Sequence, residues 1–222
     1  VAAAMDRADV LFVCVGTPEG ENGAADVSQL NEVAATIGAN LDGYKLVIEK
    51  STSPVKTVEE IKRTISEHAA NNSGRRHGTD FDVAVNPEFL REGMAMRDFL
   101  EPTRIVLGVE SERAASILMR VYQPLFDRMG GEGESPIILT DTSSAEIIKH
   151  AANAFLATKV SFANMVADLC EATDANIDDV TCGLGLDPRI GPYMRAGIGY
   201  GGSCFPKDIE AFRQIAHELG YD

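Results

Sequence analysis

The sequence has no apolar run long enough to cross a membrane. A spanning helix needs roughly 18 consecutive apolar residues, and every apolar run in this 222-residue chain is shorter. Residues 1–6 also lack the basic start and the long apolar stretch of a signal peptide. We therefore expect no membrane partner.

An excess of positive charge is also missing. The chain has 20 Lys and Arg against 34 Asp and Glu, which gives a net charge of −14. Nucleic-acid phosphates need basic partners, so this acidity argues against a nucleic-acid-binding protein. An acidic protein that binds an anionic substrate must place its few cations locally, which makes the positions of Lys and Arg informative.

Metal-binding patterns of cysteine are absent as well. The four cysteines, Cys14, Cys170, Cys182 and Cys204, include no CxxC pair, and no histidine is arranged with them as a zinc site requires. We expect no metal and a reduced, cytoplasmic setting. Cys14 lies in an apolar run and Cys170 in an apolar helical pattern, so both are expected in the core.

Strand and helix patterns alternate over the first two-thirds of the chain, which predicts an open, mostly parallel α/β sheet. We expect helix starts at Asp26, where Gln29 completes a capping pair, and at Ser53-Pro54. No strand–GxGxxG–helix unit opens this part, so the sheet is expected to be a partial Rossmann-like one. The expected strands are Val10–Gly16, Lys45–Ser51, Phe81–Val85, Arg104–Glu110 and Pro136–Thr140.

The pattern changes after Asp141, where we place the domain boundary: residues 1–141 form the sheet domain and residues 142–222 an all-α central domain. Ser143 and Glu146 are spaced as a capping box, and no Gly or Pro interrupts the next 30 or so residues. The resulting helix, 143–172, is apolar on most faces, which indicates burial inside a domain or in a dimer interface. Shorter helices are expected on either side of the Gly/Pro-rich loop 185–206.

The strongest chemical signal is the segment 199–208, GYGGSCFPKD. A cysteine on a glycine-rich loop is accessible, and Lys207 would favour the thiolate of Cys204. The alternative is a structural turn with an incidental cysteine. The nearby string Gly197–Gly202 matches GxGxxG, but no strand precedes it, so we reject it as a dinucleotide-binding fingerprint.

Further polar residues gather at helix and strand positions suited to a ligand. Lys149 and Asn153 share one face of the long helix, although an isolated lysine there more often reaches to solvent. Three segments follow predicted strands, where open α/β sheets bind ligands, and together they predict one crevice. These segments are VCVGTP at 13–18, KST at 50–52 and NPEFLRE at 86–92.

Taken together, these strings resemble the UDP-glucose/GDP-mannose dehydrogenase family, and they follow the family's order over nearly the whole chain. GYGGSCFPKD and DPRIG look most like its UDP-glucose 6-dehydrogenase branch. Ser203 stands where the N-acetylhexosaminuronate branch usually has His, which disfavours that branch. The strings are VCVGTP, KST, NPEFLREG, PTRIVLG, EIIKHAANAFLATKVSFAN and RIGPYMRAGIGYGGSCFPKD.

The resemblance implies an NAD-dependent enzyme that oxidises the C6 alcohol of a nucleotide sugar twice, most closely UDP-glucose to UDP-glucuronate. Cys204 would form a thiohemiacetal and then a thioester. Lys149 and Asn153 would stabilise the oxyanion, and Asp208 would move protons together with Lys149. Glu88 and Thr52 would assist thioester hydrolysis.

The resemblance also implies binding residues. Those for NAD are Thr17, Thr52, Glu92 and Lys207. Those for the substrate are Glu88, Phe89, Leu90, Arg91, Glu92, Lys149, Asn153, Tyr193, Met194, Arg195, Ala196, Gly197 and Gly201, with Arg195 offering its charge to a diphosphate.

Three alternatives stay open: a GDP-mannose 6-dehydrogenase, a single-step hydroxy-acid dehydrogenase of the same superfamily, and a non-catalytic fragment that dimerises. Against the family's pattern, the N-terminal GxGxVG unit and the C-terminal nucleotide-sugar domain are missing. We therefore expect residues 1–141 to be the remainder of an NAD-binding domain, and a homodimer to form through the 143–172 helix.

Overall fold

The computed structural model describes residues 5–18, 20, 25–72, 74–129, 136–202 and 204–221. The chain divides into two compact units, Val1–Lys149 and His150–Asp222. The division falls inside one long helix, α6 (Thr142–Ala172). Each unit is described by itself.

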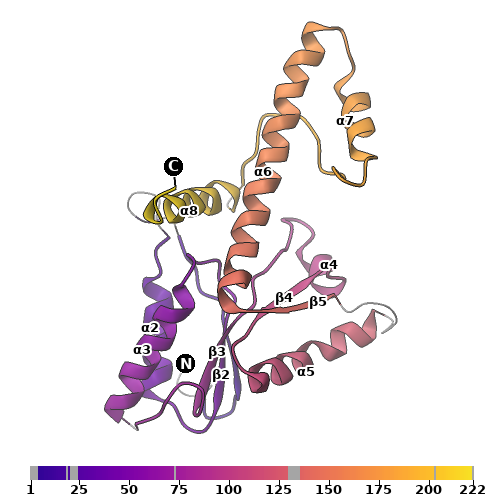
Figure 1. The fold of residues 1–222 in the computed structure, drawn as a ribbon. Helices are drawn as coiled ribbons and strands as arrows, with labels where there is room; N and C mark the ends of the chain where they lie inside the picture. The colour runs from indigo at the N-terminus through magenta and orange to yellow at the C-terminus, as the bar shows by residue number, and fades with distance from the viewer. Residues whose placement is uncertain are drawn as a thin grey trace. The chain divides into compact units, whose positions relative to one another are not determined.

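A five-stranded sheet forms the centre of the first unit (Figure 1). Its strands lie in chain order: β1 (Val10–Val13), β2 (Lys45–Glu49), β3 (Phe81–Val85), β4 (Ile105–Gly108) and β5 (Ile137–Thr140). β1, β2 and β3 are parallel, β4 is antiparallel to β3, and β5 is parallel to β4. The predicted α/β class with a mostly parallel sheet is confirmed.

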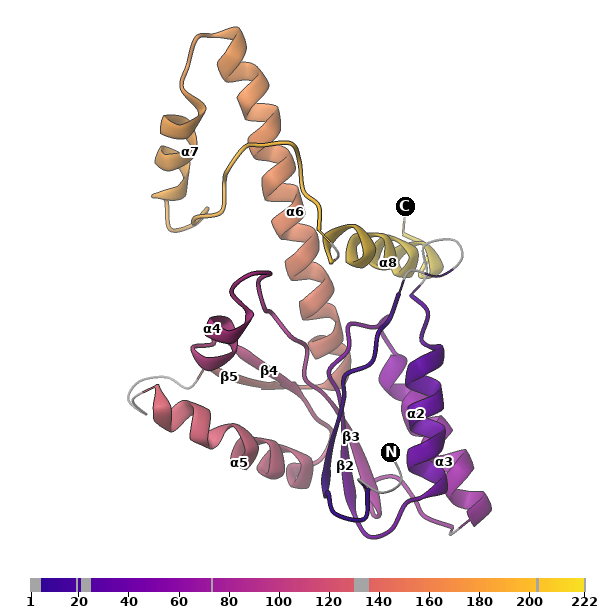
Figure 2. The same cartoon turned by 180° about the vertical axis from the view of Figure 1, so that it is seen from behind.

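Helices cover both faces of this sheet. α2 (Ser28–Ala39) and α3 (Thr57–Asn72) pack together on one face, and α5 (Glu112–Arg128) lies on the other (Figure 2). Successive residues of a strand point to opposite faces, so Val47 joins the core under α2 and α3 while Leu46 and Ile48 join the core under α5. Every residue of β2 and β3 is buried, as expected for strands covered on both sides.

The prediction for β1 needs correction. We expected a buried strand over Val10–Gly16, but β1 ends at Val13 and only that residue is buried. Within the described part of the chain β1 pairs with β2 alone, so it is an edge strand. Cys14, expected in the core, is exposed for this reason, whereas Cys170 is buried as predicted.

Two predicted helix starts and one predicted capping box are also wrong. α2 begins at Ser28, with Asp26 accepting from the backbone N–H of Ser28 at 2.9 Å. α3 begins at Thr57, because Ser53 donates to Glu49 instead of capping a helix.

The long helix α6 begins within one residue of the predicted start, but its predicted cap is wrong. Asp141 accepts from the N–H of Ser144 at 2.7 Å, so the expected box of Ser143 and Glu146 does not form. Glu146 instead accepts from the N–H groups of Lys56 and Val58 at the start of α3, at 2.8 and 3.2 Å.

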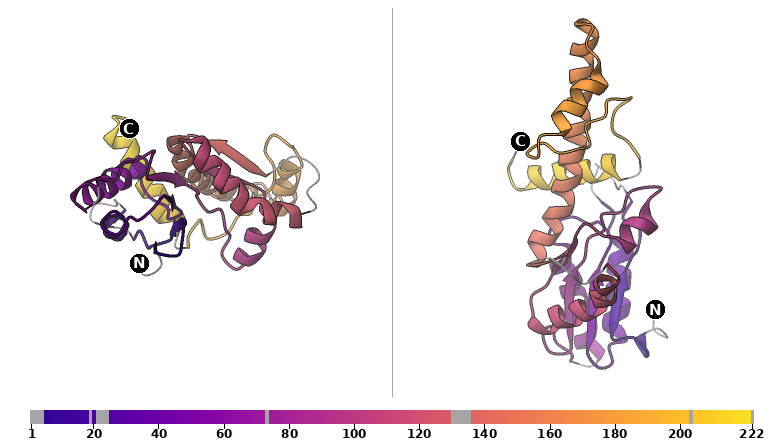
Figure 3. Two further views of the ribbon diagram at one scale, coloured as in Figure 1. Left: turned by 90° about the horizontal axis from the view of Figure 1, so that it is seen from below. Right: turned by 90° about the vertical axis from the view of Figure 1, so that its right-hand side faces the viewer.

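The second unit is helical. α7 (Ile177–Gly185) runs beside the C-terminal half of α6, and α8 (Phe205–Glu218) follows a long loop (Figures 1 and 3). Asn176 caps α7 by accepting from the N–H of Asp178 at 2.9 Å. Among the described residues, no helix is both long and apolar enough to pass through a bilayer.

Candidate active site

The carboxyl ends of β1 and β2 meet at one edge of the sheet, because the two strands are parallel. The hydroxyl of Thr17 donates to the carbonyl of Thr52 at 2.6 Å, and the hydroxyl of Ser51 donates to that of Val15 at 2.7 Å. These bonds tie the VCVGTP and KST segments together. The sequence prediction that they share one location holds for these residues.

Lys149 is buried and paired. It is 5% exposed, and its Nζ lies 3.1 Å from Oε1 of Glu88. The other oxygen of Glu88 accepts from the N–H of Leu90 at 2.6 Å, which fixes the carboxylate. The first turns of α6 therefore place a cation beside the segment that follows β3, and a lysine that only reaches to solvent is ruled out.

The residues of the NPEFLRE segment after Glu88 are more open. They are not helical, since α4 begins only at Ala95. Leu90, Arg91 and Glu92 are exposed, and Arg91 forms an ion pair with Asp98. The guanidinium of Arg104 lies 3.9 Å from the ring centre of Phe89 and holds that ring by a cation–π contact.

A second polar cluster lies in the helical unit. Nδ2 of Asn153 donates to Oδ2 of Asp208 at 2.6 Å, and Nζ of Lys207 donates to Oδ1 of Asp208 at 2.8 Å. Asp208 is only 1% exposed, so its charge needs both partners. The amine of Lys207 thus lies against Asp208, whereas we expected it to act on the thiol.

Cys204 stands at the start of α8. It is the N-cap residue, it is exposed, and its carbonyl accepts from the N–H of Asp208 at 2.8 Å. One helical turn therefore carries the predicted nucleophile at its first position and the buried carboxylate at its end. No disulfide joins the four cysteines, all of which the structure describes.

The loop before Cys204 is braced by α6. Asn164 accepts from the N–H of Gly197 at 2.7 Å, and Lys159 donates to the carbonyls of Ile190 and Pro192. Tyr193 adopts a positive φ of 77°, which is rare for a residue with a side chain. The GxGxxG string lies in this loop with no strand before it, as expected.

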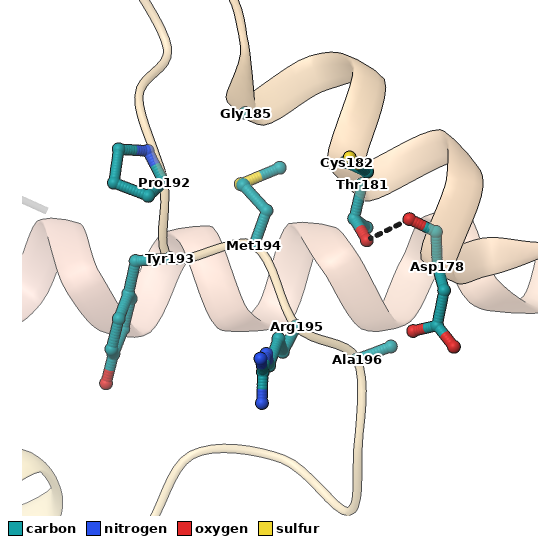
Figure 4. A pocket seen from close by; sticks show the side chains of 9 residues that line it. All are labelled: Asp178, Thr181, Cys182, Gly185, Pro192, Tyr193, Met194, Arg195 and Ala196. Atoms are coloured by element: carbon teal, nitrogen blue, oxygen red, sulfur yellow. Dashed lines mark hydrogen bonds between the residues drawn. The ribbon is translucent and has the colours of Figure 1, made fainter.

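An open pocket of about 660 Å³ lies between α7 and this loop (Figure 4). Met194 is buried, while Tyr193, Arg195 and Gly201 are exposed. The pocket is lined by Asp178, Thr181, Cys182, Gly185, Pro192, Tyr193, Met194, Arg195 and Ala196. Four of the predicted substrate residues, Tyr193–Ala196, therefore border one cavity.

Two family models cover most of the chain. The model of the UDP-glucose/GDP-mannose dehydrogenase family's NAD binding domain matches residues 1–126. The model of the same family's central domain matches residues 143–222. The chain belongs to this family.

Relatives within the family carry consistent names. The chain is 44% identical over its full length to "UDP-glucose 6-dehydrogenase TuaD" of Bacillus subtilis (strain 168), of which it covers 45%. It is 45% identical over 97% of its length to a UDP-glucose 6-dehydrogenase of Rhizobium meliloti (strain 1021), of which it covers 47%. The chain thus spans about half the length of the curated relatives it matches.

Solved structures of the family share this fold. A UDP-glucose dehydrogenase from the archaeon Pyrobaculum islandicum matches with a TM-score of 0.88 and 40% identity, over 99% of this chain and 49% of that one. A GDP-mannose dehydrogenase from Pseudomonas aeruginosa matches with a TM-score of 0.74 and 32% identity, over 100% of this chain and 50% of that one.

The sheet edge fits the family's cofactor, NAD. Open α/β sheets bind nucleotides beyond the carboxyl ends of their strands. At that edge a Cβ added to Gly16 would meet no atom within 4 Å, so space stands open beside the backbone. Thr17 and Thr52 lie in the same place. In the described part of the chain, no group of three or more His, Cys, Asp or Glu is arranged to hold a metal ion.

Several residues that shape the site were not predicted from the sequence. Lys159 and Asn164 brace the loop, and both are polar residues in an apolar helix, which is the signal that singled out Lys149 and Asn153. Asn86 was treated only as the start of a motif, yet it is buried at 1% exposure and bonded through its side chain to Val106 and Tyr122. No sequence pattern shows those long-range partners.

Proposed function

We propose that this chain is part of an enzyme that oxidises the C6 alcohol of a nucleotide sugar to the carboxylate in two NAD-dependent steps. UDP-glucose is the proposed substrate and UDP-glucuronate the product. The observation that carries the proposal is the first turn of α8, where exposed Cys204 precedes buried Asp208, whose carboxylate accepts from Asn153 and Lys207. The names of the relatives support the choice of sugar.

Cys204 explains how one protein performs two oxidations. NAD, when bound, accepts one hydride in each step. In the first step the C6 alcohol loses that hydride and a proton and becomes an aldehyde. The thiolate of Cys204 adds to the aldehyde carbon, and the resulting oxyanion takes up a proton to give a thiohemiacetal. Loss of the second hydride and of the hydroxyl proton gives a thioester, and water breaks its C–S bond to release the carboxylate and the thiol.

The resemblance assigns the remaining steps to other polar and charged residues. Lys149 supplies a fixed cation for the negative oxygen of the intermediate, and Asn153 supplies a hydrogen-bond donor. Asp208 moves protons through water together with Lys149. Glu88 and Thr52 direct the water that hydrolyses the thioester.

Binding is assigned by the same resemblance. Thr17, Thr52, Glu92 and Lys207 contact NAD. Arg195, exposed beside the pocket of Figure 4, offers its guanidinium to the diphosphate. The other residues that contact the substrate are Glu88–Glu92, Lys149, Asn153, Tyr193, Met194, Ala196, Gly197 and Gly201.

The proposal extends to domains and assembly. Residues 1–141 are the remainder of an NAD-binding domain and residues 142–222 a central domain, in a cytoplasmic homodimer formed through α6. An exposed apolar stripe with spacings of three, four, seven and eight residues supports the dimer. Its members, called the α6 stripe below, are Ile147, Phe155, Phe162, Met165 and Leu169.

The full-length protein provides the test. It is offered UDP-glucose, GDP-mannose and UDP-N-acetyl sugars, and NADH is counted per sugar consumed. We expect UDP-glucose to react fastest and to yield two NADH. Cys204→Ala should lower acid formation at least about a thousandfold, while Cys170→Ala, a buried cysteine without a proposed role, keeps the wild-type rate.

Each alternative predicts a different result. One NADH per sugar, or a fully active Cys204→Ala variant, would indicate a single-step dehydrogenase. Preference for GDP-mannose would indicate a GDP-mannose 6-dehydrogenase. If no sugar reacts, the dimerising, non-catalytic role is favoured.

A further inference from the structure

Lys50 lies in the first unit close to Glu88 and Lys149, but it has no role in the mechanism above. It directly follows Glu49, the last residue of β2, and its Nζ donates to both the carbonyl and the side-chain oxygen of Asn86, each at 3.2 Å. A lysine that bonds to neutral oxygens at a strand end is fixed in place, unlike a lysine whose chain extends into solvent.

Asn86 in turn is bonded on every side. Its N–H donates to the carbonyl of Glu49 at 2.9 Å, and its Nδ2 donates to the carbonyl of Val106 at 2.9 Å. The hydroxyl of Tyr122 donates to its Oδ1. This network joins β2, β3, β4 and α5 at one point, and Lys50 contributes the charged donor.

Glu88 lies two residues after Asn86. The position of Asn86 therefore limits where the carboxylate of Glu88 can lie. Glu88 meets Nζ of Lys149 at 3.1 Å. The chain of contacts from Lys50 through Asn86 to Glu88 and Lys149 lies entirely within the first unit.

The charges around Lys50 fit this arrangement. Burial lowers the pKa of Lys50, the negative charge of Glu88 and that of a Cys14 thiolate raise it, and the nearby cation of Lys149 lowers it. Arg128 lines the same apolar cavity as Lys50 and Cys14. Glu88 and Lys149 are therefore both close enough to Lys50 for their charges to act on it.

We propose that Lys50 is a positioning residue that fixes the Asn86–Glu88 segment, so that Glu88 stays against Lys149 for hydrolysis of the thioester. The proposal rests on the function proposed above, because it assigns Glu88 to that step. Lys50 itself need not touch the sugar. Its loss should therefore slow the release of product more than it weakens binding of the substrate.

The test uses the full-length protein and the variants Lys50→Met and Lys50→Arg. A water-soluble carbodiimide reacts with protonated carboxyl groups, and peptide mass spectrometry compares its attack on Glu88 with that on exposed Glu92. Without Lys50 the segment is held less firmly and Glu88 leaves Lys149 more often, so we expect Lys50→Met to raise the Glu88-to-Glu92 labelling ratio at least threefold. Lys50→Arg should keep the wild-type ratio.

A second measurement follows the reaction. Intact-mass spectrometry during turnover should find the covalent adduct on Cys204 in most Lys50→Met molecules and in few wild-type or Lys50→Arg molecules. The KM for the nucleotide sugar should change less than twofold while kcat falls. A role that is only structural would not trap the adduct.

The results separate this inference from the proposed function. A Lys50→Met protein with wild-type labelling and no adduct overturns the inference. If circular dichroism shows that Lys50→Met does not fold, Lys50→Gln, which removes the charge but keeps a donor, is judged by the same two measurements. If the wild type oxidises no nucleotide sugar, the proposed function fails, yet the labelling ratio still decides whether Lys50 holds Glu88.

Discussion

Glu49 is a buried carboxyl group whose surroundings change its pKa. It ends β2 with 1% exposure, and within the described residues its Oε2 has no hydrogen-bond partner. Burial raises its pKa to about 8, the nearby charge of Glu146 adds to the rise, and the hydrogen bond from Ser53 opposes it. Glu49 is therefore mostly neutral in the folded protein at neutral pH.

The stability of the protein should depend on pH through Glu49. The unfolded chain releases this proton near pH 4.5 and the folded chain at about 8, so the folded state holds the extra proton in between. The free energy of unfolding should then fall by up to about 1.4 kcal/mol per pH unit as pH rises through that window, and level off above it. Glu49→Gln should remove this slope and be more stable than the wild type above pH 8. Urea unfolding at several pH values measures it.

The control for Glu49 is Glu32→Gln, which changes an exposed carboxylate on α2. It should leave the pH slope as in the wild type. Equal slopes in the wild type and Glu49→Gln would show that Glu49 is ionised in the folded protein.

Asn153 offers a second test at the same scale. Its amide lies 2.6 Å from the buried carboxylate of Asp208. Asn153→Asp would replace that donor with a second carboxylate, so we expect a loss of roughly 3 kcal/mol in stability at neutral pH. Part of the loss should return as pH falls, because one of the two groups takes up a proton.

Thermal unfolding at pH 5 and pH 8 would detect this effect. Asn40→Asp is the matched control, since Asn40 is exposed at the end of α2. A variant Asn153→Asp that is as stable as the control at both pH values would contradict the assigned contact.

Individual site residues could be predicted from the sequence, but their partners could not. The helical spacing places Lys149 and Asn153 on one face and marks them as polar residues in an apolar helix. Their partners, Glu88 and Asp208, are 61 and 55 residues away along the chain. Such contacts depend on how strands and helices pack, and local spacing carries no information about that.

At the scale of elements, the packing of α2 against α3 depends on one glycine. A Cβ at Gly38 would lie 2.5 Å from the carbonyl oxygen of Ile65 and 2.8 Å from the Cβ of His68. Neither atom can move without shifting α3. We therefore expect Gly38→Ala to destabilise the protein by about 2–3 kcal/mol.

Chemical unfolding would measure the loss at Gly38. The control is Gly183→Ala on α7, where an added Cβ meets no atom within 4 Å. Alanine favours a helix over glycine by about 1 kcal/mol, so the control should be neutral or stabilising. If both variants behave alike, the close approach at Gly38 is not limiting.

The order and type of the elements could be predicted from hydrophobic patterns, but helix starts could not. Glu146 shows why, because it has the spacing of a cap for its own helix. Its carboxylate accepts from Lys56 and Val58 at the start of α3 instead, 90 and 88 residues earlier in the chain. When the start of a distant helix offers two N–H groups, a carboxylate can bond to them and no longer caps its own helix.

At the scale of the whole molecule, α6 exposes large apolar side chains that the described part of the chain does not cover. Its 31 residues carry buried positions such as Ala157 and Ala163, and also the α6 stripe. The sequence predicted an apolar helix, yet it could not say which apolar residues the chain itself would cover. Large exposed side chains in a regular stripe are typical of an interface.

Formation of the proposed homodimer should therefore depend on the α6 stripe. Phe155 and Leu169 are 64% and 62% exposed, and burying them against a second copy would remove this apolar surface from water. We expect the full-length double variant Phe155→Glu, Leu169→Glu to dissociate, because each interface would hold uncompensated charges. Light scattering after size exclusion should show a dimer for the wild type and a monomer for the variant. The control is Asp168→Lys, a charge change at an exposed α6 position outside the stripe, which should stay dimeric. A wild type that is monomeric at micromolar concentration, or a double variant that stays dimeric, would show that α6 is not the interface.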